Sequence, residues 1–479
     1  MPTLKSLFCG LALACAGLYA QGQPASAEGI RPLRLTVTAA DSRGEPVSDL
    51  TADDFRISDD GKPQRVALFR SNGGGLPAPS QGGREAFNRA APRHITAVLL
   101  DFLNENQTDV QEASRKIGAS LKQLGSGESL YLYALQMDGK LYPVHAFEKP
   151  GETPDPKWVQ DAEGMMGKAV KKLAGVRPAV GDEEIVKRTY VGLETLAKEL
   201  AAFPGRRDIV WVTTNVPSVG DPKKIGCSGT WVDCGLYVQH LSVTLDAAGA
   251  VVNPYSYSSL LGPEKTRDME EMAGLTGGST YLSQDMGAVA KALSNGAGVY
   301  AMVYEPPPTN WDMNFHKVKV TCERKGIKIQ ARQRYFGLTD SRTPAMREQA
   351  TLVAAYQSPM DVPDIGLRAA LSPGSDPQKT IRVEMRVDPA DLLLQEQGGM
   401  YEGQLTVLFS ARTAAGPKGE PAIANLALHM TKEQRATALK EGIPLAREYP
   451  IDNTIQNVRL IVLDHGANSV GSLTMPVAR

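Results

Sequence analysis

The chain has 479 residues and a formal net charge of −1, with 42% hydrophobic and 22% charged residues. This composition is typical of globular proteins, and the length is enough for two or three domains. A near-neutral charge creates no long-range field that would attract nucleic acid or an anionic membrane surface. The sequence therefore predicts no nucleic-acid partner.

The N-terminus has the pattern of an export signal. Lys5 precedes an uncharged, mostly apolar run over residues 6–20, and small residues follow, with the best cleavage site at Ala25-Ser26-Ala27. The run is too short to span a bilayer and leads into polar chain, so we expect a secretory signal peptide over residues 1–27. No later stretch is apolar enough to cross a membrane. We therefore expect an exported protein, either periplasmic or secreted to the cell surface, without a transmembrane segment.

Two cysteines outside this signal are close in sequence. Cys227 and Cys234 enclose a loop that carries Trp231, and an oxidising compartment favours a disulfide between them. A zinc site that recruits His240 would lack a fourth ligand. Cys322 lies in a strand-like run and is expected to be a free thiol.

Residues 28–70 have the pattern of short strands joined by tight turns. Leu33, Leu35 and Val37 alternate with polar residues, and Asp59-Asp60-Gly61 indicates a hairpin. The aspartates of this segment are expected to serve turns and caps, because no calcium-loop spacing connects them. A linker rich in Gly, Pro, Ser and Ala is expected over residues 71–92.

Residues 93–297 alternate between strand and helix patterns. An apolar strand ends at Asp101, a helix with a capping box follows near Thr108, and further apolar strands are expected near residues 209–213 and 251–257. Such alternation predicts a mostly parallel sheet with helices on both faces. Ligands of such sheets bind at the carboxyl ends of the strands.

The remaining chain returns to β patterns. Residues 298–340 are expected to form a β extension of the α/β domain. Residues 341–479 contain about seven β-rich runs and one short helix between Thr431 and Gly442. Short strands at regular spacing predict a C-terminal β-sandwich.

Several different short motifs follow one another between residues 30 and 340. They include Asp41-x-x-Gly44-x-Pro46-Val47, Leu50-Thr51-x-x-Asp54-Phe55, Val98-Leu99-Leu100-Asp101, Pro204-Gly205-Arg206, Thr276-Gly277-Gly278 and Val303-Tyr304-x-Pro306. In this order the chain resembles the von Willebrand factor A-related proteins that are abundant in acidobacteria. The resemblance implies a von Willebrand A fold, which is a Rossmann-like module, with β segments on either side.

The resemblance also implies a position for a metal site. In von Willebrand A domains that bind Mg²⁺, the first strand ends in Asp-x-Ser-x-Ser, and a later Thr and Asp complete the site. Asp101 keeps the first position, but Leu103 replaces a serine and removes its hydroxyl. We expect a degenerate site that binds Mg²⁺ or Ca²⁺ weakly or not at all, with these further candidate ligands: Asn104, Glu105, Thr213 and Thr214. In the alternative interpretation, Asp101 and Asn104 only cap the first helix and order its loop.

The sequence lacks the motifs of common enzyme classes, so no catalytic residues are predicted. We expect a non-enzymatic interaction protein, active in adhesion or assembly, that binds a protein partner through loops at the carboxyl edge of the sheet. The candidate contact residues are Asn215, Trp231, Tyr255 and Tyr257; internal packing is the alternative role for the two tyrosines. Two other functions remain open. One is a divalent-cation-dependent adhesin that uses Asp101, and the other is a structural component of the cell envelope.

Overall fold

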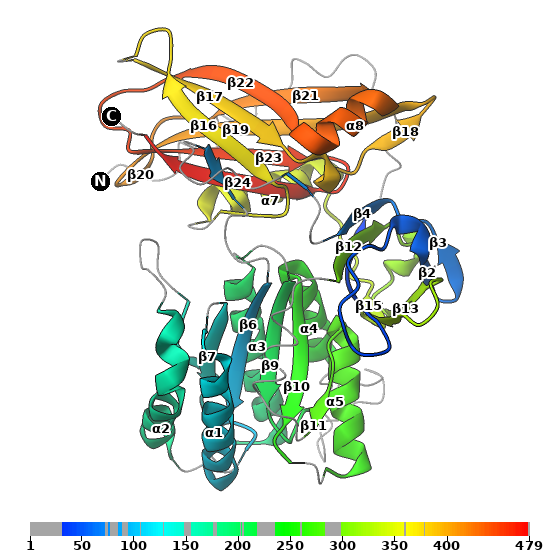
Figure 1. The fold of residues 1–479 in the computed structure, drawn as a ribbon, viewed down its shortest axis with the longest axis vertical. Helices are drawn as coiled ribbons and strands as arrows, with labels where there is room; N and C mark the ends of the chain where they lie inside the picture. The colour runs from blue at the N-terminus through cyan, green and yellow to red at the C-terminus, as the bar shows by residue number, and fades with distance from the viewer. Residues whose placement is uncertain are drawn as a thin grey trace.

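The computed structural model describes most of the chain from residue 31 onward, as three packed units (Figure 1). The described residues are 31–71, 75–76, 85–88, 94–105, 107–127, 129–147, 155–175, 180–201, 203, 206–217, 235–258, 261–282, 298–358, 361–377 and 379–477. The predicted signal peptide, the predicted Cys227–Cys234 disulfide and Trp231 lie outside these residues. Within them, no helix combines the length and the apolar character that crossing a membrane requires.

The first unit contains the α/β sheet that the sequence predicted. Its six strands lie in the order β11-β10-β9-β6-β7-β8, and all neighbouring pairs are parallel except β7 with β8. The order corresponds to a doubly wound sheet in which β6 and β9 form the topological switch point. The strands are β6 (His94–Asp101), β7 (Leu130–Leu135), β8 (Leu141–His145), β9 (Arg206–Val212), β10 (Ala250–Ser256) and β11 (Tyr281–Leu282).

Helices cover both faces of this sheet. Because side chains alternate along a strand, Leu99 and Trp211 pack on one side and Val98 and Val210 on the other. The first face is covered by α3 (Asp182–Leu200), α4 (Gly235–Ala248) and α5 (Pro263–Thr276). The second is covered by α1 (Gln107–Leu121) and α2 (Ala162–Leu173), with short 3-10 turns η2 (Lys122–Leu124) and η3 (Pro156–Asp161). Every residue of β6, β7, β9 and β10 is buried, as a parallel sheet requires.

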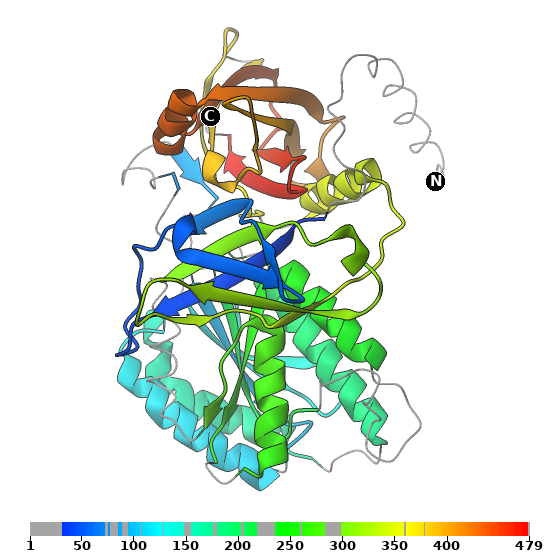
Figure 2. The same cartoon turned by 90° about the vertical axis from the view of Figure 1, so that its right-hand side faces the viewer.

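The second unit joins two segments that are far apart in the sequence. β1 (Leu33–Ala40) pairs with β12 (Val299–Tyr304), and β2 (Phe55–Asp59) pairs with β13 (Phe315–Cys322). Two four-stranded sheets, β14-β1-β12-β4 and β15-β13-β2-β3, contribute to one hydrophobic core. Figure 2 shows the blue N-terminal strands lying among the yellow-green ones. The other elements are η1 (Ala52–Asp54), β3 (Lys62–Gln64), β4 (Leu68–Ser71), η4 (Pro308–Asn310), β14 (Lys328–Gln330) and β15 (Arg334–Phe336).

This pairing corrects one expectation. The sequence predicted residues 298–340 as an extension of the α/β domain, but their strands hydrogen-bond to residues 33–71. The reason is that strand pairing across more than two hundred residues leaves no local pattern in the sequence.

The third unit contains the antiparallel sheets expected near the C-terminus. The sheets β22-β17-β16-β5 and β18-β19-β23-β24, with β20 and β21 added beside β19, contribute side chains to one core. Its elements are α7 (Pro344–Gln357), β16 (Leu367–Pro373), β17 (Thr380–Val387), η5 (Pro389–Asp391), β18 (Gln395–Gln397), β19 (Met400–Thr413), β20 (Gly416–Pro417), β21 (Ala422–Thr431), α8 (Lys432–Glu441), β22 (Ile443–Pro450), β23 (Asn457–Asp464) and β24 (Ser469–Pro476). The sequence predicted α8 and missed α7, whose Ala355 packs with residues of β23 and β24.

Part of the predicted linker, residues 71–92, packs against the third unit. Within it, β5 (Glu85–Phe87) adds a strand to the third unit by pairing with β16. The backbone N–H of Leu76 donates to Asp388 Oδ2 at 2.9 Å, and just before the linker Arg70 pairs with Asp391. A composition rich in Gly, Pro, Ser and Ala predicted a linker, but Leu76 and β5 are held against the C-terminal sheets.

Candidate functional site

The carboxyl ends of the parallel strands point away from the C-terminal unit, towards the bottom of Figure 1. Asp101 is the last residue of β6, and Thr213 directly follows β9. These two strands are neighbours at the topological switch point, where ligands of doubly wound sheets bind. The structure thus brings together five residues that the sequence predicted at this edge: Asp101, Asn104, Glu105, Thr213 and Thr214.

The carboxylate of Asp101 is buried and surrounded by donors. Its Oδ1 accepts the backbone N–H groups of Leu103 and Asn104, both at 2.9 Å. Its Oδ2 accepts Asn104 Nδ2 at 2.8 Å and Trp211 Nε1 at 3.0 Å. An ionised carboxylate has about four lone-pair positions, so these contacts use its whole acceptor capacity.

Burial is the main influence on the acidity of Asp101. It raises the pKa of the carboxyl group to about 6, although the hydrogen bonds from Asn104 and Trp211 oppose the rise. The nearby negative charge of Glu105 raises this pKa further. The four N–H donors favour the ionised form, because a proton on the carboxyl would meet another donor.

Glu105 joins the loop after β6 to the loop after β9. Its side chain is buried, and its Oε1 accepts Thr213 Oγ1 at 3.0 Å and the backbone N–H of Thr214. Thr214 Oγ1 lies 2.9 Å from each carboxylate oxygen of Glu105. These bonds fix the relative position of the two loops, and the two threonines use their hydroxyls on protein.

Two residues of this network were not found from the sequence. Thr189 is fully buried on α3, where it accepts Asn104 Nδ2 at 2.9 Å and donates to Ile185 O at 2.8 Å. A signal was present, because Thr189 lies one helical turn from both Ile185 and Leu193 on an otherwise apolar face. The sequence does not indicate the role of Trp211, because a tryptophan in an apolar strand is usually a hydrophobic core residue.

The residues present do not fit the oxygen coordination shell of Mg²⁺ or Ca²⁺. Such a cation needs carboxylate and hydroxyl oxygens with unused lone pairs, but Asp101 and Glu105 are already bonded to donors. Leu103, at a serine position of the metal-binding motif, is fully buried in the core. The geometry favours the alternative in which Asp101 and Asn104 order the loop before α1.

The predicted partner contacts have different surroundings. Asn215 is exposed, and Tyr257 is half-buried with its ring near Lys116. Burial and the charges of Glu105 and Asp109 raise the pKa of Tyr257. The expectation that Tyr255 is an exposed contact is wrong: it is 3% exposed and packs in the core beneath α1 and α2. Its position in β10 gives it the same orientation as the buried Val251.

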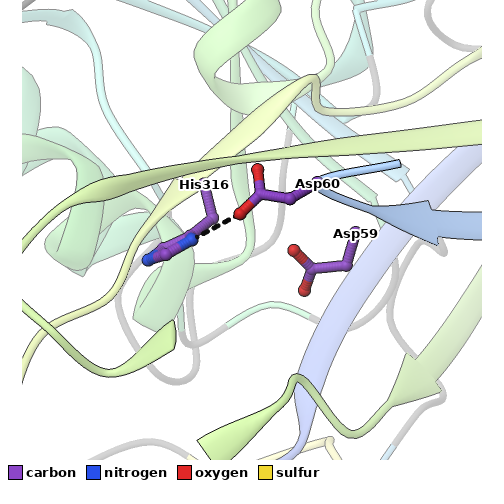
Figure 3. A group of neighbouring side chains, drawn as sticks. All are labelled: Asp59, Asp60 and His316. Atoms are coloured by element: carbon purple, nitrogen blue, oxygen red, sulfur yellow. Dashed lines mark hydrogen bonds and ion pairs between the residues drawn. The ribbon is translucent and has the colours of Figure 1, made fainter. Parts of the chain in front are cut away.

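A second polar group lies in the β unit that β1 and β12 share. Carboxylate and imidazole atoms of Asp59, Asp60 and His316 lie within 4.8 Å of one another (Figure 3). Asp59 is buried and is held by hydroxyls of Tyr304 and Tyr335, each at 2.9 Å. It also accepts Asn310 Nδ2 at 2.9 Å. Asp59 is therefore a structural acceptor inside the unit.

His316 lies between two carboxylates and forms an ion pair with them. Its Nδ1 is 2.8 Å from Asp60 Oδ2, and its Nε2 is 2.9 Å from Asp312 Oδ1. Two such contacts need an N–H on both ring nitrogens, which is the protonated imidazolium. Burial lowers the pKa of His316, but the two aspartates outweigh burial and raise it above its ordinary value. An imidazolium has no lone pair for a metal, so this group is an ionic clamp between β13 and the hairpin after β2.

Comparisons with known proteins find structural neighbours of low similarity. No family model matches the chain, and no curated protein matches it. Among solved structures, the TFIIH p34 N-terminal domain matches at 10% identity and a TM-score of 0.27, over 43% of this chain and 98% of that one. A von Willebrand factor type A protein from Catenulispora acidiphila matches at 11% and 0.27, over 64% and 80%. Human COPII-coat protein Sec24c matches at 9% and 0.26, over 83% and 47%. TM-scores this low support no inference about ligand or activity.

Substitution of Asp101 by Asn should destabilise the protein in a pH-dependent way. At neutral pH the amide would place an N–H group against one of the four donors, which costs about 1–3 kcal/mol. The folded pKa of about 6 lies above the value of 3.8 expected when Asp101 is unfolded. The carboxyl group therefore contributes stability that is fully present below about pH 4 and is lost as pH rises through about 6.

The measurement is urea unfolding of both proteins at several pH values, followed by circular dichroism. The difference in unfolding free energy between wild type and Asp101→Asn should shrink between about pH 4 and pH 7. A difference that grows over this range would contradict the raised pKa.

Substitution of His316 by Gln should remove a stabilising charge. Because the folded pKa of His316 is raised, its contribution is fully present below about pH 6.5 and is lost as pH rises above the folded pKa. In scanning calorimetry, the variant should melt below wild type at about pH 5.5, and the gap should narrow towards about pH 9. A gap that is independent of pH would show that His316 is not titrating in the folded state.

Proposed function

We propose that this chain is an exported, non-enzymatic interaction protein with a von Willebrand factor A-like module. In this proposal, the module binds a protein partner at the carboxyl edge of β6, β9 and β10 without a cation. The observation that carries the proposal is a network made of two neighbouring hydrogen-bonded groups, Asp101 with Asn104 and Glu105 with the two threonines after β9. At the topological switch point, the polar groups of this network are therefore bonded to other groups of the protein.

The class of protein rests on two kinds of support. The sheet order and the covering helices match the Rossmann-like module that the motif resemblance implies. The network at the switch point contains carboxylates, an amide, hydroxyls and an indole. These groups are buried and hydrogen-bonded to one another, so their contacts hold the two loops together. These features favour recognition over chemistry.

The network also favours binding through pre-organised loops. Glu105 holds the loop after β6 and the loop after β9 in one geometry, so little conformational entropy is lost when a partner contacts them. Asn215 is exposed directly beside this junction, and its backbone N–H donates to Thr213 Oγ1 at 3.1 Å. Among the residues that the structure describes, we propose Asn215 and Tyr257 as contacts for the partner.

Two other functions remain as alternatives. In a cation-dependent adhesin, Mg²⁺ or Ca²⁺ would have to displace the donors around Asp101 before a partner could complete its shell. A structural component of the cell envelope would need no binding site at the carboxyl edge of the sheet. Charge reversal at Asp101 would not separate these functions cleanly, because a buried lysine there would disrupt the fold. Experiments at the exposed Asn215 avoid this difficulty.

Divalent cations should leave the stability of the protein unchanged. A ligand that binds only the folded state raises the thermal midpoint, and the rise grows with the ratio of ligand concentration to the dissociation constant. We expect equal midpoints in EDTA and in roughly millimolar Mg²⁺, Mn²⁺ or Ca²⁺. A rise that grows with cation concentration and that Asp101→Ala abolishes would instead support the adhesin.

A photo-crosslinking residue at position 215 tests the binding edge directly. In cells that make the protein, crosslinking from position 215 should yield a discrete protein adduct identifiable by mass spectrometry. The matched control places the same residue at Lys319, which is exposed on β13 in a different unit. Adducts at neither position, or identical adducts at both, would contradict recognition at this edge.

Export has a separate readout. The intact mass of the protein purified from its native host should correspond to a chain that lacks residues 1–27, because a signal peptide is removed at the predicted Ala-Ser-Ala site. A full-length mass would contradict export by this route.

A further inference from the structure

Strand β21 is an unusual edge strand. It runs for ten residues, Ala422–Thr431, and contains no charged residue and no proline. Among the residues that the structure describes, its hydrogen-bonding partner is β19, on one side alone. Side chains of its outer face are exposed, and Ile423 is 55% exposed. The other side of β21 therefore presents a row of backbone N–H and C=O groups to solvent.

The other described edge strands are protected in the ways that natural proteins use. Many are only two to four residues long: β3, β4, β5, β11, β14, β15, β18 and β20. β8 contains Pro143, and β22 contains two prolines and the charged pair Arg447 and Glu448. The contrast makes β21 an exception in its own molecule, because long, flat and neutral edges template further pairing.

The last long edge, that of β24, is covered by the chain itself. The backbone N–H of Ser472 donates to Val362 O at 2.8 Å, and that of Thr474 donates to Asp361 Oδ2 at 2.9 Å. A segment of this chain thus protects β24, whereas β21 has no such cover among the described residues.

We propose that β21 pairs antiparallel with β21 of a second copy of this chain, which makes a two-fold symmetric dimer with a continuous sheet across the interface. Antiparallel pairing of a strand with itself is isologous, so each copy offers the same surface. The backbone hydrogen bonds supply the contact, as in other cases of strand addition.

The alternation of side chains between the two faces of the sheet is compatible with this pairing. In a register centred on Leu426, residue 424 faces residue 428 of the second copy, and residue 423 faces residue 429. Residues that face each other therefore belong to the same side of the sheet. The buried Leu428 and Met430 would continue the apolar side, and the exposed Asn425 and Ala427 would meet on the outer side.

Charge complementarity at the strand ends selects this register. The exposed Glu420 precedes β21, and the exposed Lys432 follows it. In the register centred on Leu426, the end of β21 that follows Glu420 in one copy meets the end that precedes Lys432, the first residue of α8, in the other. The two-fold symmetry gives two equivalent attractive pairings of these ends. The strand itself is neutral, and the chain has a net charge of −1, so no repulsion opposes two copies.

Sedimentation velocity of the full chain tests the proposal. Over about 1–100 µM, wild type should shift from a monomer to a species of twice the mass, since dimer fraction depends on concentration. The double variant Asn425→Lys with Ala427→Lys places lysine opposite lysine and should raise the dissociation constant at least about tenfold. The variant Asn425→Glu with Ala427→Glu should do the same.

An equal mixture of the lysine and glutamate variants should recover the dimer, because opposite charges then face each other. The matched control, Met346→Lys with Val353→Lys on the exposed side of α7, should dimerise like wild type. Circular dichroism melts of all variants check that they fold. Wild type that stays monomeric would overturn self-pairing and leave the edge for a strand of another protein. Dimers that the lysine variant retains, or that the mixture does not recover, would also overturn the proposal.

Discussion

A buried carboxylate must be surrounded by donors, and this requirement organises the carboxyl edge of the α/β sheet. Removing the charge of Asp101 from water without hydrogen bonds would cost several kcal/mol. The chain meets the requirement with two backbone N–H groups and an amide from the loop after β6, and with an indole from β9. The indole of Trp211 ties β9 to β6, and Asn104 ties the loop to α3 through Thr189. The position of the edge loops therefore follows from the solvation of one side chain.

The same physical rule appears at the opposite half of the sheet. Asp208 is fully buried in β9, where Arg206 donates two hydrogen bonds to it and Asn253 Nδ2 lies 2.7 Å away. Burial alone would raise the pKa of Asp208, but Arg206 and His94 hold it well below its usual range. At this end a cation balances the charge, whereas at the carboxyl edge neutral donors do so. This difference explains why the pKa of Asp101 is raised and that of Asp208 is lowered.

Non-local pairing decides how the three units are connected. The chain starts one β unit with β1, continues through the α/β sheet, and returns to complete that unit with β12 and β13. Before it enters the α/β sheet, the chain also forms β5, which pairs with β16 of the third unit. The α/β sheet is thus inserted between strands that pair with each other, and both of its ends are fixed. Such an arrangement gives the loops at its carboxyl edge a rigid base.

The sequence by itself determined the local features of this protein. Apolar runs bounded by turn residues predicted β6, β9 and β10, and the capping box at Thr431 predicted α8, because these signals depend on neighbouring residues. The order of strands along the chain also placed Asp101, Glu105 and Thr213 at one edge. Tertiary structure alone decided that Glu105 accepts the hydroxyls of the two threonines and that Tyr255 is buried. It also decided that residues 298–340 pair with the N-terminal strands and that a helix precedes the C-terminal sheets. These outcomes depend on which surfaces meet and on how each buried charge finds donors, and no local sequence pattern carries that information.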